Sequence, residues 1–500
     1  MMNGHGKSDR PKVPAKFVNK GEAANTSAER DGGKGSSQGK HGEQNTRRTQ
    51  CRGPQSANSA GSVQSALDRV RKIAKSDKKV QFTNLLHHIS NVDRLRAVYF
   101  LMKKTAAAGV DGETWAGYGE NLEENLQSLS ERLQKGGYRA KPVRRVFIAK
   151  ADGKQRPLGV PVLEDKIVQR STVEVLNAIY ETEFLEFSYG YRPGKGQHHC
   201  LDALYMGLFG KVNWVLDADI RGFFDNLNHD WLIKFVEHRI KDKRVIRLIQ
   251  KWLKAGVMLD GRREETEEGV PQGGSISPLL ANIYLHYVLD LWARQRRNDK
   301  SRGDMIIVRW ADDFVVGFEH RSQAETFLAD LKERMLKFSL ELHPEKTRIL
   351  EFGRFAINNR KKRGLRKPET FNFLGFAHIC GNNSRGNKKF TVRRHTIAKK
   401  MRAKLLEVKT ELRRRLHQPI PEQGKWLRSV VDGHCRYYGV PTNLQQLGSF
   451  RFQVSRLWYR TLMRRSQKSR LTWKRMARYI ERWLPHAKLH HPFPLKRIRV

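Results

Sequence analysis

The chain has 500 residues, of which 96 are Lys or Arg and 51 are Asp or Glu, so its formal net charge at pH 7 is +45. This length exceeds what one hydrophobic core serves, and the charge recurs along the whole chain, which favours about two or three domains and a nucleic-acid partner. No basic amphipathic anchor or long apolar run favours a membrane partner, and the 4 isolated cysteines form no zinc pair or disulfide framework. Without a hydrophobic signal peptide, we expect a cytoplasmic protein.

Residues 1–60 are rich in Gly, Ser, Lys, Gln and Asn and contain very few apolar residues. Such a segment cannot bury enough surface to offset the entropy lost on ordering. We therefore predict a disordered basic leader, with a flexible RNA-contacting arm as the alternative.

Residues 61–145 show apolar side chains at helical spacing, interrupted by a Gly-containing loop at 109–112. A second helical run, at 122–133, ends at two consecutive glycines. The first predicted core face consists of Leu67, Val70, Ile73, Ala74, Leu85, Leu86, Ile89, Leu95 and Val98.

A basic hairpin follows in the stretch VRRVFIAKADGKQRPLGVP, residues 143–161. We predict a strand at 146–148, a turn at Asp152-Gly153 and a return strand from Arg156. Lys150 and Arg156 then lie on opposite arms, where they can close over an anionic ligand or simply remain solvated.

The first acidic stretch is VNWVLDADIRGFFDNLN, residues 212–228. Its first half has strand composition, and the alternation of a strand places Asp217 and Asp219 on one face. Phe223 and Phe224 follow as an aromatic wall beside the carboxylates, although core packing is the alternative for both rings. An acidic end to a buried strand is difficult to explain by packing alone.

The stretch GVPQGGSISPLLANIYL, residues 269–285, predicts a Gly-rich turn before a helix. We expect Ser277 to be the N-cap residue and Pro278 to occupy the first helical position. The backbone N–H groups of such a turn suit a phosphate or a nucleotide base.

The stretch MIIVRWADDFVVGF, residues 305–318, predicts a buried hairpin with an acidic turn at Ala311, Asp312 and Asp313. Adjacent carboxylates between apolar strands repel each other, and a divalent cation offsets that cost, because Mg²⁺ prefers hard oxygen ligands. A solvated turn is the alternative. Asp219 supplies a third carboxylate, which favours the metal site.

Residues 388–500 interleave Arg and Lys with aromatic residues. Apolar spacing from Ile397 to Leu412 predicts a helix whose other face is basic. Basic helices with aromatic side chains can bind RNA through phosphates and stacking, although most of the aromatic rings are expected to lie in the core. They are Trp426, Tyr437, Tyr438, Trp458, Tyr459, Trp473 and Trp483.

Seven blocks together carry a family resemblance. In chain order they are KADGKQRPLGVP, FSYGYRPGKG, LDADIRGFFDNL, VPQGGSISPLLANIYL, RWADDFVVGF, LELHPEKTRIL and FNFLGF. The series resembles the reverse-transcriptase domain of group II intron-encoded proteins, which also act as maturases. The resemblance runs from about Gly109 to Phe376 and continues more weakly beyond.

The resemblance implies an α+β fold, a right-hand polymerase with fingers, an antiparallel palm sheet and an α-helical thumb. Residues 61–145 would extend the fingers, and residues 146–378 would form the fingers and palm. Residues 388–500 would form the thumb, or X maturase domain, with a basic tail. We expect no HNH endonuclease, because its cysteine pairs are missing.

The resemblance also implies site residues. Asp219, Asp312 and Asp313 would hold two Mg²⁺ ions, for which Mn²⁺ can substitute, and Lys150 and Arg156 would grip the incoming triphosphate.

Three further positions match the family pattern. Phe224 would be the steric gate that excludes a ribose 2′-hydroxyl, Gln272 would line the nascent base pair, and Lys346 would lie near the triphosphate. Trp310 stands where the family commonly has Tyr, so an aromatic ring remains while the phenolic hydroxyl is lost.

The expected activity is RNA-directed DNA polymerisation on intron RNA, combined with binding of that RNA to assist splicing and mobility. The expected partners are group II intron RNA, a DNA target and primer, deoxynucleoside triphosphates and, as an open alternative to a monomer, a second copy of the chain. The alternatives are mainly an RNA-binding splicing maturase, with polymerase chemistry secondary or lost, or a related bacterial reverse transcriptase of the retron, diversity-generating or CRISPR-associated kind.

Overall fold

The structure is a computed structural model that describes residues 54–149, 155–259, 262–264, 268–270, 272–299, 303–382, 390–467 and 470–494. Lys150 and the expected Asp152-Gly153 turn lie outside the described residues. Residues Val63–Val500 form one unit by their contacts, and the elements discussed below belong to it from residue 63 onward. None of the helices within the described ranges is long and apolar enough to cross a membrane.

Helices dominate residues 54–180. They are α1 (Pro54–Ser76), α2 (Leu86–Ile89), α3 (Val92–Leu101), α4 (Trp115–Glu120), α5 (Leu122–Gln134) and α6 (Leu163–Tyr180). The predicted periodicity is confirmed for most positions, since Leu67, Val70 and Leu95 are buried, but Ile73 is 48% exposed and does not belong to the core. Helix α1 begins at Pro54, inside the segment expected to be a disordered leader.

The apolar residues at helical spacing from Leu67 to Val98 lie mainly on three helices, α1, α2 and α3, and a capping residue separates the last two. Asn91 has an extended backbone, and its side chain accepts a hydrogen bond from the Arg94 N–H, which begins α3. Helix α5 follows its predicted pattern, with acidic residues in its first turn and Leu126, Leu129 and Leu133 buried.

The basic stretch forms the expected hairpin. Strand β1 (Val143–Ala149) pairs antiparallel with β2 (Gln155–Val160), and Ile148 faces Arg156 in the register. Two short strands, β4 (Val257–Leu259) and β5 (Arg262–Glu264), complete a sheet of order β2-β1-β4-β5.

A second sheet carries the acidic stretches. Its order is β6-β7-β3-β8, and all its neighbouring strands are antiparallel. The strands are β3 (Trp214–Ala218), β6 (Met305–Trp310), β7 (Asp313–Phe318) and β8 (Arg348–Glu351).

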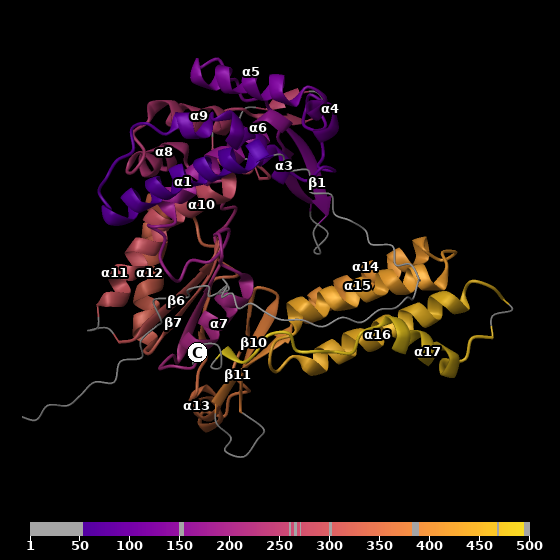
Figure 1. Cartoon of the computed structure of the whole chain (residues 1–500). Coiled ribbons are helices and arrows are strands. Elements are labelled where there is room, and N and C mark those ends of the chain that lie inside the picture. The colour runs from indigo at the N-terminus through magenta and orange to yellow at the C-terminus, as the bar shows by residue number, and fades with distance from the viewer. Residues whose placement is uncertain are drawn as a thin grey trace, which may run out of the picture. The chain divides into compact units, whose positions relative to one another are not determined.

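Both faces of this sheet are covered, as the alternation of apolar residues requires. Leu216 and Val316 lie in the large core cluster shared with the helices α8, α10 and α12, whereas Val215 and Val315 pack with α7 in a second cluster. In Figure 1, α12 runs beside this sheet, where it contacts β3 and β7. The helices of this part of the chain are α7 (Gln197–Leu208), α8 (His229–Glu237), α9 (Lys243–Leu253), α10 (Ser277–Leu285), α11 (Leu291–Asn298) and α12 (Arg321–Lys337).

The start of α10 corrects one expectation. The N-cap residue is Ile276, whose backbone is already helical, so Ser277 and Pro278 are the first two helical residues and Ser277 is not the cap. Between α10 and α11 the helix widens into one π-helical turn, η1 (His286–Asp290).

The C-terminal third begins with a small sheet and continues as helices. The sheet, of order β11-β10-β9, follows α13 (Ala356–Lys362) and consists of β9 (Phe371–Phe373), β10 (Phe376–Asn382) and β11 (Phe390–Thr396). The helices are α14 (Ala398–Arg414), α15 (Ile420–Tyr438), α16 (Leu444–Met463) and α17 (Trp473–Trp483), which Figure 1 shows side by side in orange to yellow.

This helical segment has its own apolar core, in which Val408, Leu412 and Trp458 are fully or almost fully buried. Trp458 is therefore a core residue, as expected for most of the aromatic rings, whereas Trp473 is 44% exposed. Asn443 ties the segment to β11, because its buried side chain exchanges two hydrogen bonds with Thr396, of 3.0 and 2.9 Å.

Candidate active site

The acidic turn lies at the tip of the β6–β7 hairpin. Trp310 pairs with Asp313, which leaves Ala311 and Asp312 as a two-residue turn. The backbone φ of Ala311 is 56°, a left-handed value that is uncommon for a residue with a Cβ atom. The hairpin thus presents two consecutive carboxylates at the end of a buried sheet.

Asp219 comes from the neighbouring strand. It follows β3 directly, and continuing the β3–β7 register by one residue, from the pair Ala218–Phe314, places it opposite Asp313. Its backbone carbonyl accepts a hydrogen bond of 2.7 Å from the N–H of His343. Cross-strand neighbours lie about 5 Å apart, so the sheet brings together the three carboxylates that were expected to act together.

The electrostatics of the turn show that these carboxylates lie close enough to affect one another's ionisation. Desolvation, followed by the charges of Asp312 and Asp219, raises the pKa of Asp313 to about 6. Desolvation and Asp219 also raise the pKa of Asp312, a change that the Arg156 guanidinium opposes. Desolvation raises the pKa of Asp217 to about 6 as well, although Arg348 counteracts it. Negative charge is therefore costly here unless a cation accompanies it.

Lys346 supplies one such cation. Its ammonium donates to the Asp219 carboxylate at 2.6 Å, and both groups retain access to solvent. The residue expected near the triphosphate thus contacts a proposed metal ligand.

Arg156 and Gln272 are in direct contact. The Arg156 Nε donates to the Gln272 Oε1 at 2.9 Å, and the Gln272 amide donates to an Asp225 carboxylate oxygen at 3.0 Å. The backbone of Gln272 is fixed too, since its carbonyl accepts from the Gly159 N–H at 2.6 Å. Sequence reasoning missed Asp225, although it lies in the same acidic block as Asp219.

The backbone of Phe224 is bonded to the segment that carries Gln272. Its carbonyl accepts a hydrogen bond of 2.8 Å from Val270, two residues before Gln272. Its ring is only partly buried, whereas Phe223 is 2% exposed and belongs to the core. The two rings meet edge to face at 5.3 Å.

Tyr191 is a second residue that the sequence reasoning did not single out. It is 53% exposed with a φ of 58°, and partial burial together with the charge of Asp312 raises its pKa. Tyr191 lies in the FSYGYRPGKG block, which contributed to the family resemblance but was not assigned a role of its own. That position was the signal in the sequence that pointed to Tyr191.

The donor set suits a hard divalent cation, because it consists of carboxylate oxygens without Cys or His. Among the residues that the structure describes, no three acidic, His or Cys side chains already converge on a single metal position. Mg²⁺ in nucleotide enzymes is commonly held by one or two carboxylates together with phosphates and water, so a preformed cage is not required. The residues present therefore fit the cation.

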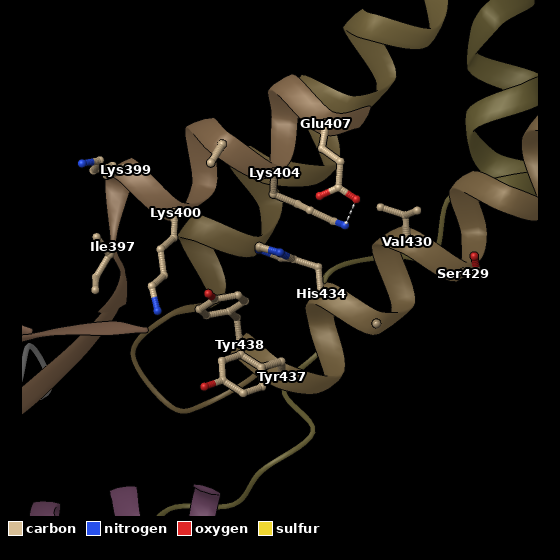
Figure 2. Close-up of a pocket in the computed structure, with 12 residues that line it drawn as sticks. Ile397, Lys399, Lys400, Lys404, Glu407, Ser429, Val430, His434, Tyr437 and Tyr438 are labelled. Atoms are coloured by element: carbon tan, nitrogen blue, oxygen red, sulfur yellow. Dashed lines mark hydrogen bonds and ion pairs between the residues drawn. The ribbon is translucent and has the colours of Figure 1, made fainter. Parts of the chain in front are cut away.

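A groove between α14 and α15 has a volume of about 790 Å³. Figure 2 shows Lys400 and Lys404 reaching from α14, and Tyr437 and Tyr438 from α15, with an ion pair of 2.7 Å between Lys404 and Glu407. The charge of Lys400 opposes the rise in the pKa of Asp313, so the groove lies within electrostatic range of the acidic turn. Basic and aromatic side chains are the combination expected of a nucleic-acid surface.

Comparison with known proteins agrees with this geometry. Residues 148–378 match the family described as reverse transcriptase (RNA-dependent DNA polymerase). The group II intron-encoded protein LtrA of Lactococcus lactis subsp. cremoris is 27% identical over 457 residues, which cover 77% of this chain and 75% of that protein. Protein YkfC of Escherichia coli K12 is 35% identical over 312 residues, 55% of this chain and 81% of that protein. A putative COX1/OXI3 intron 1 protein of Saccharomyces cerevisiae is 31% identical over 268 residues, 53% and 30% of the two chains.

The antiparallel sheet with its acidic turn and the matched region define a reverse transcriptase, a class of enzyme that uses divalent metal ions. Within this class the chain belongs to the family of group II intron-encoded proteins, which are reverse transcriptases and maturases. It is an RNA-directed DNA polymerase with a role in intron splicing and mobility.

Proposed function

We propose that the enzyme copies group II intron RNA into DNA at a site built on Asp219, Asp312 and Asp313. The observation that carries this proposal is the convergence of the β3 end and the β6–β7 turn inside the reverse-transcriptase match. When bound, two Mg²⁺ ions would lower the pKa of the primer 3′-hydroxyl and neutralise the charge that develops on the phosphates.

The chain's own residues bind and orient the nucleotide. Arg156 offers a planar guanidinium to the triphosphate, and Gln272, braced by Asp225, holds that guanidinium in place. Lys346 can exchange the Asp219 carboxylate for a phosphate oxygen when the nucleotide arrives. Lys150 is proposed as a second cation at the triphosphate on the basis of the resemblance.

Phe224 is proposed to pack against the sugar of the incoming nucleotide, where its partly exposed ring leaves no room for a 2′-hydroxyl. The indole of Trp310, which is partly buried beside the turn, takes the place of the phenol common in the family.

We assign residues 61–145 to an extension of the fingers, residues 146–378 to fingers and palm, and residues 388–500 to the thumb. Three sheets and the helical segment α14–α17 support this division within the described residues. The basic groove between α14 and α15 is proposed to follow the phosphate backbone of the primer–template duplex, and other basic surfaces are proposed to hold the intron RNA.

The test is extension of a DNA primer on an RNA template with Mg²⁺ and deoxynucleotides. We expect Asp312→Asn to reduce the extension rate by about a thousandfold, because the metal site supplies several kcal/mol and each ~1.4 kcal/mol is a factor of ten. Asp217→Asn is the matched control, since it removes a carboxylate from the same strand face that is not one of the proposed metal ligands. An inactive wild type, or equal losses in both variants, would contradict the proposal.

A further inference from the structure

Arg309, on β6, forms a fully buried ion pair with Asp290 at the end of η1. Both side chains are 0% exposed, and the contacts are bidentate: Nε to Oδ1 at 2.7 Å and Nη2 to Oδ2 at 2.6 Å. A buried pair of this kind adds little stability compared with apolar packing, because desolvating two charges is costly. Its position next to the acidic turn indicates another physical role.

The remaining donors of Arg309 indicate that role. Its Nη1 donates to the carbonyl of Ala311 at 2.8 Å and to the Asn282 Oδ1 at 3.0 Å. Its Nη2 also donates to the Ser188 hydroxyl at 2.7 Å. The Ala311 carbonyl belongs to the peptide group whose nitrogen is that of Asp312, so Arg309 holds the peptide that orients this carboxylate.

The turn needs such support, because its left-handed Ala311 is a conformation that persists only when the surroundings impose it. Gly190 packs directly against the turn, and a Cβ atom there would come within 2.3 Å of the Ala311 nitrogen. Asn282 donates to the Gly190 carbonyl at 2.7 Å while accepting from Arg309, so one amide braces both sides of the turn.

The π-helical turn explains how Asp290 reaches Arg309. One residue of helix corresponds to a rotation of about 100°, so the widened turn η1 decides which way Asp290 faces. Such turns are rare and occur often at functional sites.

We propose that Arg309, held by Asp290 and Asn282, is a positioning residue that fixes the Ala311–Asp312 peptide and thereby aims the Asp312 carboxylate at the catalytic metal ions. The inference rests on the proposed function of Asp312. Arg309 itself touches neither substrate nor metal; it acts through the turn.

The experiment compares Arg309→Lys with Arg239→Lys in the full-length protein. Lysine keeps the charge, but its single nitrogen has three N–H donors and cannot replace the five hydrogen bonds that the planar guanidinium donates. Arg239 is the matched control. It is 1% exposed, pairs with Glu183, and donates from its Nε to the Val80 carbonyl at 3.0 Å. Neither partner belongs to the acidic turn. Thermal unfolding, Mn²⁺ binding by electron paramagnetic resonance, and steady-state extension are measured for each.

Both variants should unfold at lower temperature. Arg309→Lys alone should weaken Mn²⁺ binding and lower kcat by about 10- to 100-fold, the usual effect of losing an outer-shell partner, with the deoxynucleotide KM changed by less than about twofold. Wild-type Mn²⁺ binding and kcat in Arg309→Lys would overturn the inference, as would equal losses in Arg239→Lys.

If Arg309→Lys does not fold, Asn282→Ala, which leaves the ion pair intact, should weaken Mn²⁺ binding in the same direction by at least about threefold. No change in that variant would overturn the inference. Extension by the wild type separates the two claims: an inactive wild type contradicts the proposed function, whereas an active wild type with unaffected variants contradicts only the role of Arg309.

Discussion

At the scale of single residues, the site combines carboxylates that are costly to ionise with cations that offset the cost. Asp219 is paired with Lys346, whereas Asp312 and Asp313 have raised pKa values. A bound cation would satisfy all three carboxylates at once, which links metal binding to pH.

The pKa of Asp313, about 6 against an ordinary value of 3.8, sets the direction of that link. Because the pKa is raised by folding, ionisation of Asp313 destabilises the metal-free protein as pH rises from about 4 to about 6, and the cost stays constant above. The ionised form holds the cation, so the increase in melting temperature caused by Mg²⁺ should grow from about pH 5 to about pH 7. Calorimetry with and without Mg²⁺ measures this; Asp313→Asn should flatten the trend, and an equal increase at both pH values would refute it.

Phe224 offers a prediction on nucleotide choice. Phe224→Ala should lower the preference for deoxynucleotides over ribonucleotides by about 100-fold, since a packed ring rejects an added hydroxyl by a factor of that order. Single-nucleotide insertion assays with deoxynucleotides and ribonucleotides give the ratio of the two insertion efficiencies. Phe224→Tyr keeps the ring and should keep the preference; an unchanged ratio in the alanine variant would remove Phe224 from the sugar pocket.

At the scale of elements, periodicity was a sufficient guide to the regular parts. The alternation in residues 212–220 correctly predicted β3, and the two β-branched runs around Asp312 predicted the β6–β7 hairpin. The alternation of a strand and the spacing of a helix record which side chains of one segment are buried, so both patterns can be recognised within that segment alone.

The residues that support the acidic turn could not be predicted from such patterns. Asp290 and Arg309 are 19 residues apart, and Ser188 lies 121 residues from Arg309, so their contacts depend on how distant segments pack. The N-cap at Ile276 differs from the expected Ser277 by one residue, which is within the precision to which helix ends are defined, and the π turn was not predicted. The resemblance supplied the roles of Phe224 and Gln272, which composition alone would not have suggested.

The α14–α15 groove makes an element-scale prediction. Lys400→Ala should weaken binding of an RNA–DNA primer–template by about tenfold, the value of one hydrogen bond to a charged group, because Lys400 lines the groove near Asp313. Lys409→Ala is the control, since Lys409 is exposed on the same helix and does not line the groove. Fluorescence anisotropy measures the affinity of each variant for the primer–template. Equal affinities in Lys400→Ala and Lys409→Ala would show that the duplex does not bind in this groove.

At the scale of the whole molecule, a net charge of +45 is the main physical property. Counterion release makes such binding depend steeply on salt, and a protein that contacts several phosphates loses about a thousandfold in affinity between about 50 and 200 mM salt. Filter binding to group II intron RNA should show this slope. Asp312→Asn should show the same salt dependence, because RNA binding and catalysis depend on different residues. An affinity that does not change with salt would contradict electrostatic binding of the RNA.

The most direct test of the account is the position of metal ions in a complex stalled with a chain-terminated primer, an RNA template, a deoxynucleoside triphosphate and Mn²⁺. Anomalous diffraction from the Mn²⁺ ions should place them between the triphosphate and the carboxylates of Asp219, Asp312 and Asp313, with Arg156 on the phosphates. Nucleotide bound without metal at these carboxylates, or Mn²⁺ held by other residues, would contradict the assignment of the active site.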